Sequence, residues 1–354
     1  MNQNNHVIDL MERVVIGRQL LENLCESFPD RLKKQKVRAL IVTGPNVWKI
    51  HRTRLEKGLA KGDISYEVHI AEVPHLDEAK KISEEAANMN ADMLIGFGGG
   101  KSIDLAKYAS SVINKIFVSI PTAASHDGIA SPFASLKGGG WSTSVKVQQP
   151  TLVLADLDVI SSSPRKLLIA GAGDAIAKFT AVADWRLAHL LRNEYYGSFA
   201  SGLALLSAKH IVRNREIIAK DQVEATRIIL EALINSSVAM GIAGSTRPAS
   251  GSEHLFSHAL DKIAPKPALH GEQTGVGTIM MAKLHRLNWK KIRSVLKKIG
   301  APTNAKELGI PEDKIIEALT IAHKIRPERY TILGDRGLTW EAAERLAVET
   351  GVIF

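Results

Sequence analysis

The sequence has a single cysteine, Cys25, in 354 residues. One thiol excludes an internal disulfide framework and favours a reducing compartment. Long apolar runs are also missing, since none reaches the roughly 18 residues that a membrane span requires. The stretch Met1–His6 has neither the basic nor the apolar region of a signal peptide. From these absences we expect a globular, cytoplasmic protein that does not insert into a membrane.

The sequence also lacks the marks of a nucleic-acid-binding protein. Its formal net charge is +9, but Lys and Arg are scattered along the chain rather than gathered in blocks. No zinc finger, RNP-like aromatic motif or basic arm is present. We therefore expect no nucleic-acid partner. A phosphorylated small substrate together with a dinucleotide would use the same positive field.

The first half of the chain alternates strands with helices. With 45% hydrophobic and 23% charged residues, a chain of this length suits two domains of a globular protein. Buried strands are predicted at 13–17, 37–43, 64–70, 93–97, 115–120 and 151–155, with helices at 19–28, 48–59, 76–89 and 103–112. The run Gly138–Trp141 predicts a hairpin excursion. This alternation indicates an α/β domain with a doubly wound, mostly parallel sheet.

The second half of the chain is predicted to be all α-helix. Helical periodicity covers residues 164–191, 198–217, 222–242, 254–263, 277–287, 289–299, 312–323 and 339–350. We place the domain boundary near Ser161–Pro164. The predicted domains are a nucleotide-binding α/β domain, residues 1–162, and an all-α domain, residues 163–354.

A run of glycines joins the strand at 93–97 to the helix at 103–112. It consists of Gly96 and Gly98–Gly100, followed by Ser102 as the predicted N-cap. Glycines let backbone N–H groups approach an anion, and the helix N-terminus adds partial positive charge. The spacing is not the G-x-G-x-x-G of the standard dinucleotide fingerprint. A diphosphate cradle and a bare turn both remain open here, and the polar stretch Pro121–Pro132 favours a site.

Polar residues gather at three places in the helical half. Asp174 is a lone carboxylate among small and apolar neighbours, His254 and His258 share one helix face, and His270 adds a third imidazole. Such a set suits Zn²⁺ with an open position for substrate, and Fe²⁺ is the alternative metal. In a chain with 12 histidines, however, an H-x-x-x-H pair also arises by chance. A metal site and a chance pair are both compatible with the spacing.

Five longer motifs occur together in a fixed order. They are Gly98–Asp104, Pro121–Pro132, Gly171–Asp174, Ser252–Asp261 and His270–Gln273. By these motifs the chain resembles the sn-glycerol-1-phosphate dehydrogenases of archaea, within the iron-containing alcohol dehydrogenase and dehydroquinate synthase-like superfamily. The resemblance covers almost the whole length. It implies a nucleotide-binding domain followed by a helical domain that holds one catalytic Zn²⁺ per chain.

The resemblance implies a role for each residue that matches a family motif. Asp174, His254 and His270 match the metal ligands, and Asp127 and His258 match positions that contact substrate, as Asp174 also does. His258 is the candidate for relaying a proton or orienting the substrate. Asp127 is expected to bind a substrate hydroxyl or to join the proton relay.

The resemblance also implies which residues contact the cofactor. They are Gly98, Gly99, Gly100, Lys101, Ser102, Ile103, Asp104, Thr122, Ala123, Ala124, Ser125 and Ser131. The second strand is followed by Gly44–Asn46, which has no acidic residue to repel a 2′-phosphate. Both NADH and NADPH are therefore expected to be accepted.

The implied activity is the NAD(P)H-dependent, Zn-assisted reduction of dihydroxyacetone phosphate to sn-glycerol 1-phosphate, the backbone of archaeal ether phospholipids. Lys101, Lys262 and Arg329 are the candidates for holding the substrate phosphate. We also expect a homo-oligomer.

Three alternatives remain beside this activity. The nearest is a glycerol dehydrogenase that acts on unphosphorylated glycerol with the same metal. A dehydroquinate synthase-like lyase is weaker, because those enzymes typically place a Glu at the position of Asp174. A non-enzymatic nucleotide-binding module would leave the three candidate metal ligands without a purpose.

Overall fold

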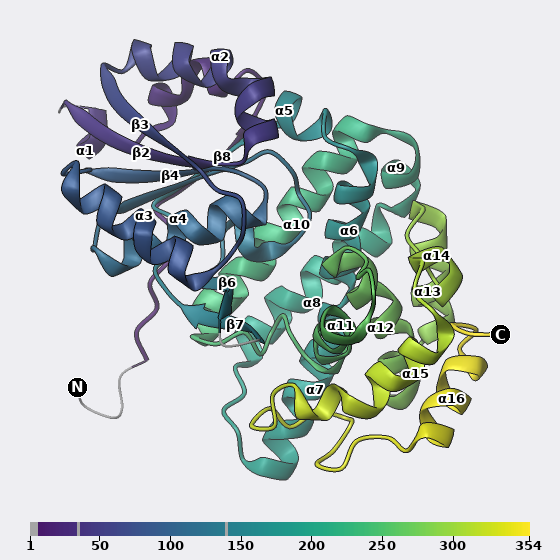
Figure 1. Ribbon diagram of the computed structural model, residues 1–354. Coiled ribbons are helices and arrows are strands. Elements are labelled where there is room, and N and C mark those ends of the chain that lie inside the picture. Colours follow the sequence, from purple (N-terminus) through teal and green to yellow (C-terminus); the bar gives the residue numbers. More distant parts are fainter. Residues whose placement is uncertain (1–5, 34–35, 139–140) are drawn as a thin grey trace. The chain divides into compact units, whose positions relative to one another are not determined.

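The computed structural model describes residues 6–33, 36–138 and 141–354. The chain divides into two compact units (Figure 1). The first unit comprises Met1–Ala124 and Gly128–Ser163, and the second comprises Ser125–Asp127 and Pro164–Phe354. Asp127 therefore belongs with the second unit, although it lies in the first half of the sequence.

The first unit is built around a six-stranded sheet in which every strand pair is parallel. Its strands, in the order in which they lie side by side, are β1 (Arg13–Gly17), β8 (Leu152–Asp156), β5 (Ile116–Pro121), β4 (Met93–Gly98), β2 (Val37–Thr43) and β3 (Ile64–Ile70). The helices of this unit are α1 (Asp30–Lys33), α2 (Pro45–Lys61), α3 (Leu76–Asn88), α4 (Gly100–Val112) and α5 (Leu157–Ser161). The predicted doubly wound parallel sheet is confirmed.

The central strands are continuous apolar runs because both of their faces are covered. β4 and β8 are buried along their whole length, and β2 is exposed only at Arg38. The chain runs from β2 to β3 toward one edge of the sheet, and from β4 to β5 toward the opposite edge. The direction of the connections therefore reverses between the neighbouring strands β2 and β4. In open α/β sheets, ligands bind beyond the carboxyl ends of the strands at such a reversal.

Two local predictions in this unit are wrong. The segment predicted as a helix at 19–28 is a 3₁₀ helix, η1 (Leu21–Ser27), and Asn23 within it has non-helical backbone angles of φ −125° and ψ 24°. Ser102 is not the N-cap of α4, because that helix already begins at Gly100 and its N-cap is Gly99. Gly99 has extended backbone angles and starts the helix without a side-chain cap.

The predicted hairpin is confirmed in its strands. β6 (Phe133–Gly138) and β7 (Trp141–Lys146) form an antiparallel pair separate from the main sheet. Its predicted turn residues Gly139 and Gly140 lie outside the described residues.

The second unit is helical along the chain from Pro164 (Figure 1). Its helices are α6 (Arg165–Ile176), α7 (Lys178–Arg192), α8 (Ser198–Arg213), α9 (Arg215–Lys220), α10 (Gln222–Ala243), α11 (Ser252–Ile263), α12 (His270–Leu284), α13 (Trp289–Ile299), α14 (Ala305–Leu308), α15 (Glu312–Ile321) and α16 (Trp340–Glu349), with 3₁₀ segments η2 (Asp127–Ile129), whose first residue alone is in this unit, and η3 (Ala322–Lys324). The prediction of an all-α second half is confirmed.

Three helix boundaries differ from the prediction. The helix predicted at 164–191 is broken at Ala177, and the one predicted at 198–217 is broken at Asn214. The helix predicted at 277–287 begins earlier, at His270. Glycines at 271, 275 and 277 interrupt the apolar periodicity of that segment, and the prediction therefore started too late.

Helix α10 passes the length and hydropathy test for a membrane span, and it is the one such helix in the part of the chain that the structure describes. The protein buries 67% of its most apolar window. α10 packs on α8 and α6, so its apolar surface is used inside the second unit. Asp221 caps its N-terminus by accepting from the backbone N–H groups of Val223 and Glu224.

Candidate active site

The glycine turn lies at the carboxyl end of β4. Gly98 has φ of +155°, and a Cβ there would lie 2.9 Å from the Ser102 Oγ, so this position requires glycine. A Cβ on Gly99 would meet no atom within 4 Å. The backbone at Gly99 therefore faces open space, next to the N-terminal N–H groups of α4. This is the arrangement that binds an anionic group.

The second cofactor segment lies beside this turn. Gly98 is level with Pro121 in the β4–β5 register, and the Thr122 N–H donates to the Gly98 carbonyl at 2.9 Å. Gly98–Gly100 and Thr122–Ala124, which are far apart in the sequence, thus share the carboxyl edge of the sheet. Ser125, the next predicted cofactor residue, belongs to the second unit.

Asp104 and Ser131 have structural partners within the first unit. The Asp104 carboxylate accepts from the Lys107 Nζ at 2.9 Å and from the Ser135 N–H at 3.1 Å. Lys107 also donates to the Gly128 and Phe133 carbonyls, at 2.6 and 2.8 Å. The Ser131 hydroxyl donates to the Phe133 carbonyl at 3.1 Å. This buried ion pair fixes the segment that follows Asp127, a function that the sequence analysis did not assign to Lys107.

The three predicted metal ligands come together in the second unit. Asp174 lies near the end of α6, His254 in the first turn of α11, and His270 is the first residue of α12. One ligand atom from each lies within 4.8 Å of the other two. Asp174 is only 1% exposed, and its Oδ1 lies 3.5 Å from the His254 Nε2.

Close contact between two helices brings Asp174 and His270 together. A Cβ on Gly173 would lie 2.1 Å from the Gly271 carbonyl oxygen, and a Cβ on Gly271 would lie 1.8 Å from the Ala170 oxygen. No larger residue fits at either position. Because each glycine adjoins a ligand in sequence, the backbone contact of α6 with α12 places the carboxylate beside the imidazole.

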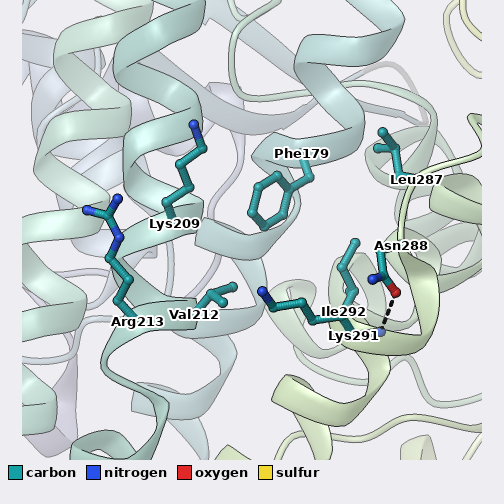
Figure 2. A pocket seen from close by; sticks show the side chains of 8 residues that line it. All are labelled: Phe179, Lys209, Val212, Arg213, Leu287, Asn288, Lys291 and Ile292. Carbon is teal, nitrogen blue, oxygen red and sulfur yellow. Dashed lines mark hydrogen bonds between the residues drawn. The ribbon is translucent and has the colours of Figure 1, made fainter.

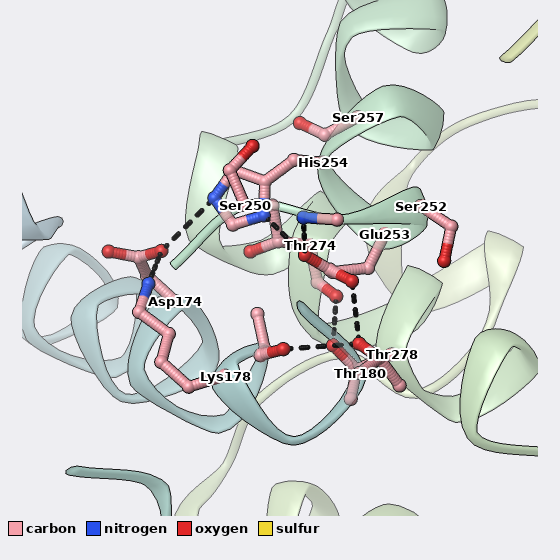
Figure 3. A network of polar contacts seen from close by, with 12 residues as sticks. Asp174, Lys178, Thr180, Ser250, Ser252, Glu253, His254, Ser257, Thr274 and Thr278 are labelled. Carbon is pink, nitrogen blue, oxygen red and sulfur yellow. Dashed lines mark hydrogen bonds and ion pairs between the residues drawn. The ribbon is translucent and has the colours of Figure 1, made fainter. Parts of the chain in front are cut away.

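Both imidazoles are oriented by a neighbouring side chain. The His254 Nδ1 lies 2.7 Å from the Glu253 Oε1, and the other Glu253 oxygen accepts from the Thr180 hydroxyl at 2.6 Å (Figure 3). The His270 Nδ1 lies 3.1 Å from the Ser257 hydroxyl. Each ring then has its Nε2 left for a ligand. One carboxylate and two imidazoles with such support fit a Zn²⁺ or Fe²⁺ ion.

Lys178 links the two aspartates of the site. Its fully buried Nζ donates to the Asp174 Oδ1 at 2.7 Å and lies 2.9 Å from the Asp127 Oδ2. Asp127 also donates its backbone N–H to Asp174 at 2.9 Å and accepts from the Ser236 hydroxyl at 2.8 Å. The sequence analysis missed Lys178, although its i+4 spacing from Asp174 was the available signal.

His258 lies one turn beyond His254 on α11. Its Nδ1 is buried without a hydrogen bond, and the nearest carboxylate oxygen, on Asp261, is 3.6 Å away. The His258 ring stacks on His270 with centroids 5.7 Å apart. His258, Asp261 and His270 form a second possible ligand group, but Asp261 is exposed. Asp261 also accepts from the Gln273 side chain at 2.9 Å. Asp174, His254 and His270 are the more buried of the two groups.

Burial and charge set the protonation states of these groups. Burial raises the pKa of Asp174, but the Lys178 ammonium and the His254 ring outweigh it and hold that pKa well below its usual value. Burial, reinforced by His254, lowers the pKa of His270 to about 3. Burial also lowers the pKa of His258. An ionised carboxylate and a neutral imidazole are the forms that bind a metal.

Two of the three predicted phosphate ligands have hydrogen-bond partners within the protein. Lys101 donates to the Glu72 carbonyl at 2.8 Å in the first unit. Arg329 donates to the Ser250 carbonyl and the Thr246 hydroxyl at 2.5 and 2.6 Å, which fixes the segment before α11. Lys262 is the residue next to Asp261 on α11. The charge of Arg326 contributes, after burial, to lowering the pKa of His258.

The chain is similar over its whole length to proteins from archaea. The family model "Iron-containing alcohol dehydrogenase" matches residues 15–164. The glycerol-1-phosphate dehydrogenase (NAD(P)+) of Sulfurisphaera tokodaii is 53% identical, with 100% of both chains covered. The enzyme of the same name from Aeropyrum pernix is 52% identical, with 98% of this chain and 99% of the relative covered.

Solved structures agree on the fold. A glycerol dehydrogenase from Schizosaccharomyces pombe has a TM-score of 0.79 at 21% identity, with 98% of this chain and 90% of that chain covered. A probable glycerol dehydrogenase from Sinorhizobium meliloti has a TM-score of 0.79 at 20% identity, with 99% and 100% covered. The full-length identity to the archaeal enzymes, rather than these distant structures, decides the family. The chain belongs to the glycerol-1-phosphate dehydrogenase (NAD(P)+) family of oxidoreductases.

Proposed function

We propose that the protein reduces dihydroxyacetone phosphate to sn-glycerol 1-phosphate with NADH or NADPH, assisted by one bound Zn²⁺. The observation that carries this proposal is the convergence of Asp174, His254 and His270 within 4.8 Å. It is supported by the names of relatives that are 53% and 52% identical to this chain. We assign cofactor binding to residues 1–162 and metal binding to residues 163–354.

The glycine turn is proposed to hold the cofactor diphosphate. Its open space at Gly99, its position at the reversal of the sheet and the adjacent Thr122–Ala124 segment support this role. The fuller proposed set is Gly98, Gly99, Gly100, Lys101, Ser102, Ile103, Asp104, Thr122, Ala123, Ala124, Ser125 and Ser131. Within this set, the hydrogen bonds of Asp104 and Ser131 favour a supporting role in shaping the loop.

Asp174, His254 and His270 are proposed to hold the metal. When bound there, a divalent cation supplies Lewis-acid polarisation of a substrate carbonyl. Glu253 and Ser257 fix the ring orientations, and Lys178 keeps the Asp174 carboxylate in place and ionised. Because Lys178 is itself a cation, it also limits how much negative charge the ligand set presents.

Asp127 and His258 are proposed to act on the substrate. Lys178 and Ser236 hold the Asp127 Oδ2, which leaves Oδ1 to accept from a substrate hydroxyl. Hydride transfer to the C2 ketone places negative charge on its oxygen, and a proton must follow. We assign delivery of that proton to His258. The His258 Nδ1 faces the Asp261 carboxylate, and a replacement proton can reach the ring at this nitrogen.

The substrate phosphate needs a cation on the His258 side of the cluster. Arg326 acts electrostatically on His258, and Lys262 follows Asp261 on the same helix. We propose Arg326 as the principal phosphate ligand, with Lys262 in support. A guanidinium matches a phosphate with two parallel hydrogen bonds.

Substrate comparison tests the proposal. We expect kcat/KM for dihydroxyacetone phosphate to exceed that for dihydroxyacetone by at least about a hundredfold, or roughly 2.7 kcal/mol, because phosphate binding holds the ketone in position. Both ketones are run with NADH and with NADPH on the same enzyme preparation. Equal rates with the two ketones would contradict the proposal and favour a glycerol dehydrogenase.

A further inference from the structure

A cavity lies in the helical unit, and it shares no residue with the metal cluster, the group of candidate ligands Asp174, His254 and His270. It has a volume of about 380 Å³ (Figure 2). Its apolar wall includes Phe179 from α7, Val212 from α8 and Ile292 from α13. Lys209, Arg213 and Lys291 line it as well. The volume is within the range of about 300–1,000 Å³ that is usual for small-molecule sites.

The charges around this cavity are all of one sign. No acidic residue is among the residues that line it. In the part of the chain that the structure describes, none of the side chains of Lys209, Arg213 and Lys291 has an ion pair or hydrogen bond. By contrast, Lys298 on the same helix as Lys291 pairs with Glu216 at 2.8 Å. Uncompensated cations beside a low-dielectric wall attract an anion.

We propose that this cavity binds an amphipathic anion, in which a phosphate or carboxylate head is joined to an apolar body. The head would pair with Lys209, Arg213 and Lys291, and the body would cover Phe179, Val212 and Ile292. Figure 2 shows the Phe179 ring facing the space between the α8 residues and the α13 residues. An inorganic anion would leave the apolar wall wet, and a neutral amphiphile would leave the cations unpaired.

Phe179 connects this cavity to the metal cluster. It lies between Lys178, which bonds Asp174, and Thr180, which bonds Glu253 behind His254. These three residues occupy the first turn of α7, immediately after the break at Ala177. An occupant that displaces the Phe179 ring therefore acts on the turn that positions two metal ligands. Occupancy of the cavity therefore changes turnover.

Calorimetry with four probes tests the binding class without substrate or cofactor, and so independently of the proposed reaction. The probes are octyl phosphate, octanoate, octyl glucoside and inorganic phosphate. We expect the two amphipathic anions to bind at least about tenfold more tightly than either octyl glucoside or inorganic phosphate. If octyl glucoside binds as tightly as the amphipathic anions, the cavity recognises only the apolar body. If inorganic phosphate binds as tightly as they do, the cavity recognises only the anionic head. Either result overturns the proposal, as does the absence of binding by octyl phosphate and octanoate.

Charge reversal on one helix locates the site. Lys291→Glu should weaken octyl phosphate binding by at least about tenfold, whereas the matched control Lys297→Glu, six residues further along α13, should change it by less than about twofold. Val212→Trp should also abolish binding by filling the cavity without a change of charge. Circular dichroism confirms that each variant is folded. Equal loss in Lys291→Glu and Lys297→Glu would show non-specific attraction and contradict the location.

The coupling is measured with the full enzyme and dihydroxyacetone phosphate. Octyl phosphate should change kcat at least about twofold in the unmodified protein and leave the kcat of Lys291→Glu unaffected. An identical change of kcat in both proteins would mean that octyl phosphate acts at another site and would contradict the coupling. An unchanged kcat in the unmodified protein, at concentrations where calorimetry shows saturation, would contradict it too.

Discussion

The glycine turn and the metal cluster are built in opposite ways. The turn is made by backbone from one short stretch, Gly98–Gly100, together with Thr122–Ala124 on the adjacent strand. The cluster is made by side chains from three helices, whose contributions at 174, 254 and 270 are far apart in the chain. A backbone site depends on local conformation. A side-chain site depends on helix packing, and here on the contact between Gly173 and Gly271.

The largest expected effect is the loss of activity when one candidate metal ligand is removed, and this change should leave cofactor binding at the glycine turn intact. We expect His254→Ala to lower kcat/KM by at least about a thousandfold, or roughly 4 kcal/mol, and to lose the bound metal. NADH binding should persist. The measurements are metal content by mass spectrometry, turnover, and circular dichroism for the fold.

Asp261→Asn is the matched control for that variant. Asp261 belongs only to the second ligand group, with His258 and His270. The control should retain its metal if Asp174, His254 and His270 form the site. If Asp261→Asn loses its metal and His254→Ala retains it, the metal site would instead be the group of His258, Asp261 and His270.

The close contact between α6 and α12 can be disrupted without substituting a candidate metal ligand. Gly271→Ala places a Cβ 1.8 Å from the Ala170 oxygen, so the two helices must separate. We expect a loss of about 1–3 kcal/mol in the free energy of unfolding, together with weaker metal binding. Denaturant unfolding and metal titration measure the two effects.

Gly202→Ala is the matched control for the packing variant. A Cβ on Gly202, inside α8, meets no atom within 4 Å. Alanine there should be neutral or stabilising by about 0.5–1 kcal/mol, because glycine loses more backbone entropy on folding. A similar loss of stability in both variants would remove the close contact as the explanation.

The same contrast explains which features were predictable from sequence. The sheet and the glycine turn follow from local apolar runs and from contiguous glycines, so their positions were predicted closely. Ser102 was misjudged as an N-cap because the sequence does not reveal that Gly99 starts the helix in an extended conformation.

Long-range support around the cluster was not predictable from spacing alone. One continuous helix over 164–191 already places Lys178 one turn from Asp174, but nothing in the spacing indicates that Lys178 also reaches Asp127. The pairing of Glu253 with His254 was equally hidden, since neighbours in a helix usually face different directions. The ligands themselves were predicted through family motifs, which record packing that a single sequence does not display.

A substitution in the glycine turn should change cofactor binding without changing the metal cluster. Gly99→Val adds a branched side chain where the structure has open space, so folding and metal content should be unchanged. If the space holds the cofactor diphosphate, the KM for NADH should rise at least about tenfold, or roughly 1.4 kcal/mol. Steady-state kinetics at saturating ketone provide the measurement. An unchanged KM would leave the glycines as a bare turn.

The smallest expected effect concerns an ion-pair cluster on the first unit. Burial lowers the pKa of His69, but its contacts with Glu78 at 2.8 Å and Glu85 at 2.6 Å outweigh this and raise that pKa. A raised pKa means stabilisation that is complete below the unfolded pKa of about 6.5 and is lost as pH rises through the folded value. These side chains are partly exposed, so the contribution is about 0.5–1 kcal/mol.

Thermal unfolding of His69→Gln against pH measures this contribution. The difference from the unmodified protein should be greatest at acidic pH and should shrink as pH rises. A difference that is constant with pH would show that packing, rather than protonation, is what the variant loses. Metal content should be unaffected at every pH at which the unmodified protein retains its metal.

The stereochemistry of the product tests the central claim most directly. The reduction product of dihydroxyacetone phosphate is offered to a dehydrogenase specific for sn-glycerol 3-phosphate, with authentic sn-glycerol 3-phosphate as the positive control. A site that fixes one face of the ketone makes one enantiomer. We expect sn-glycerol 1-phosphate, which the coupling enzyme leaves untouched. Consumption of the product by that enzyme would contradict the proposed function.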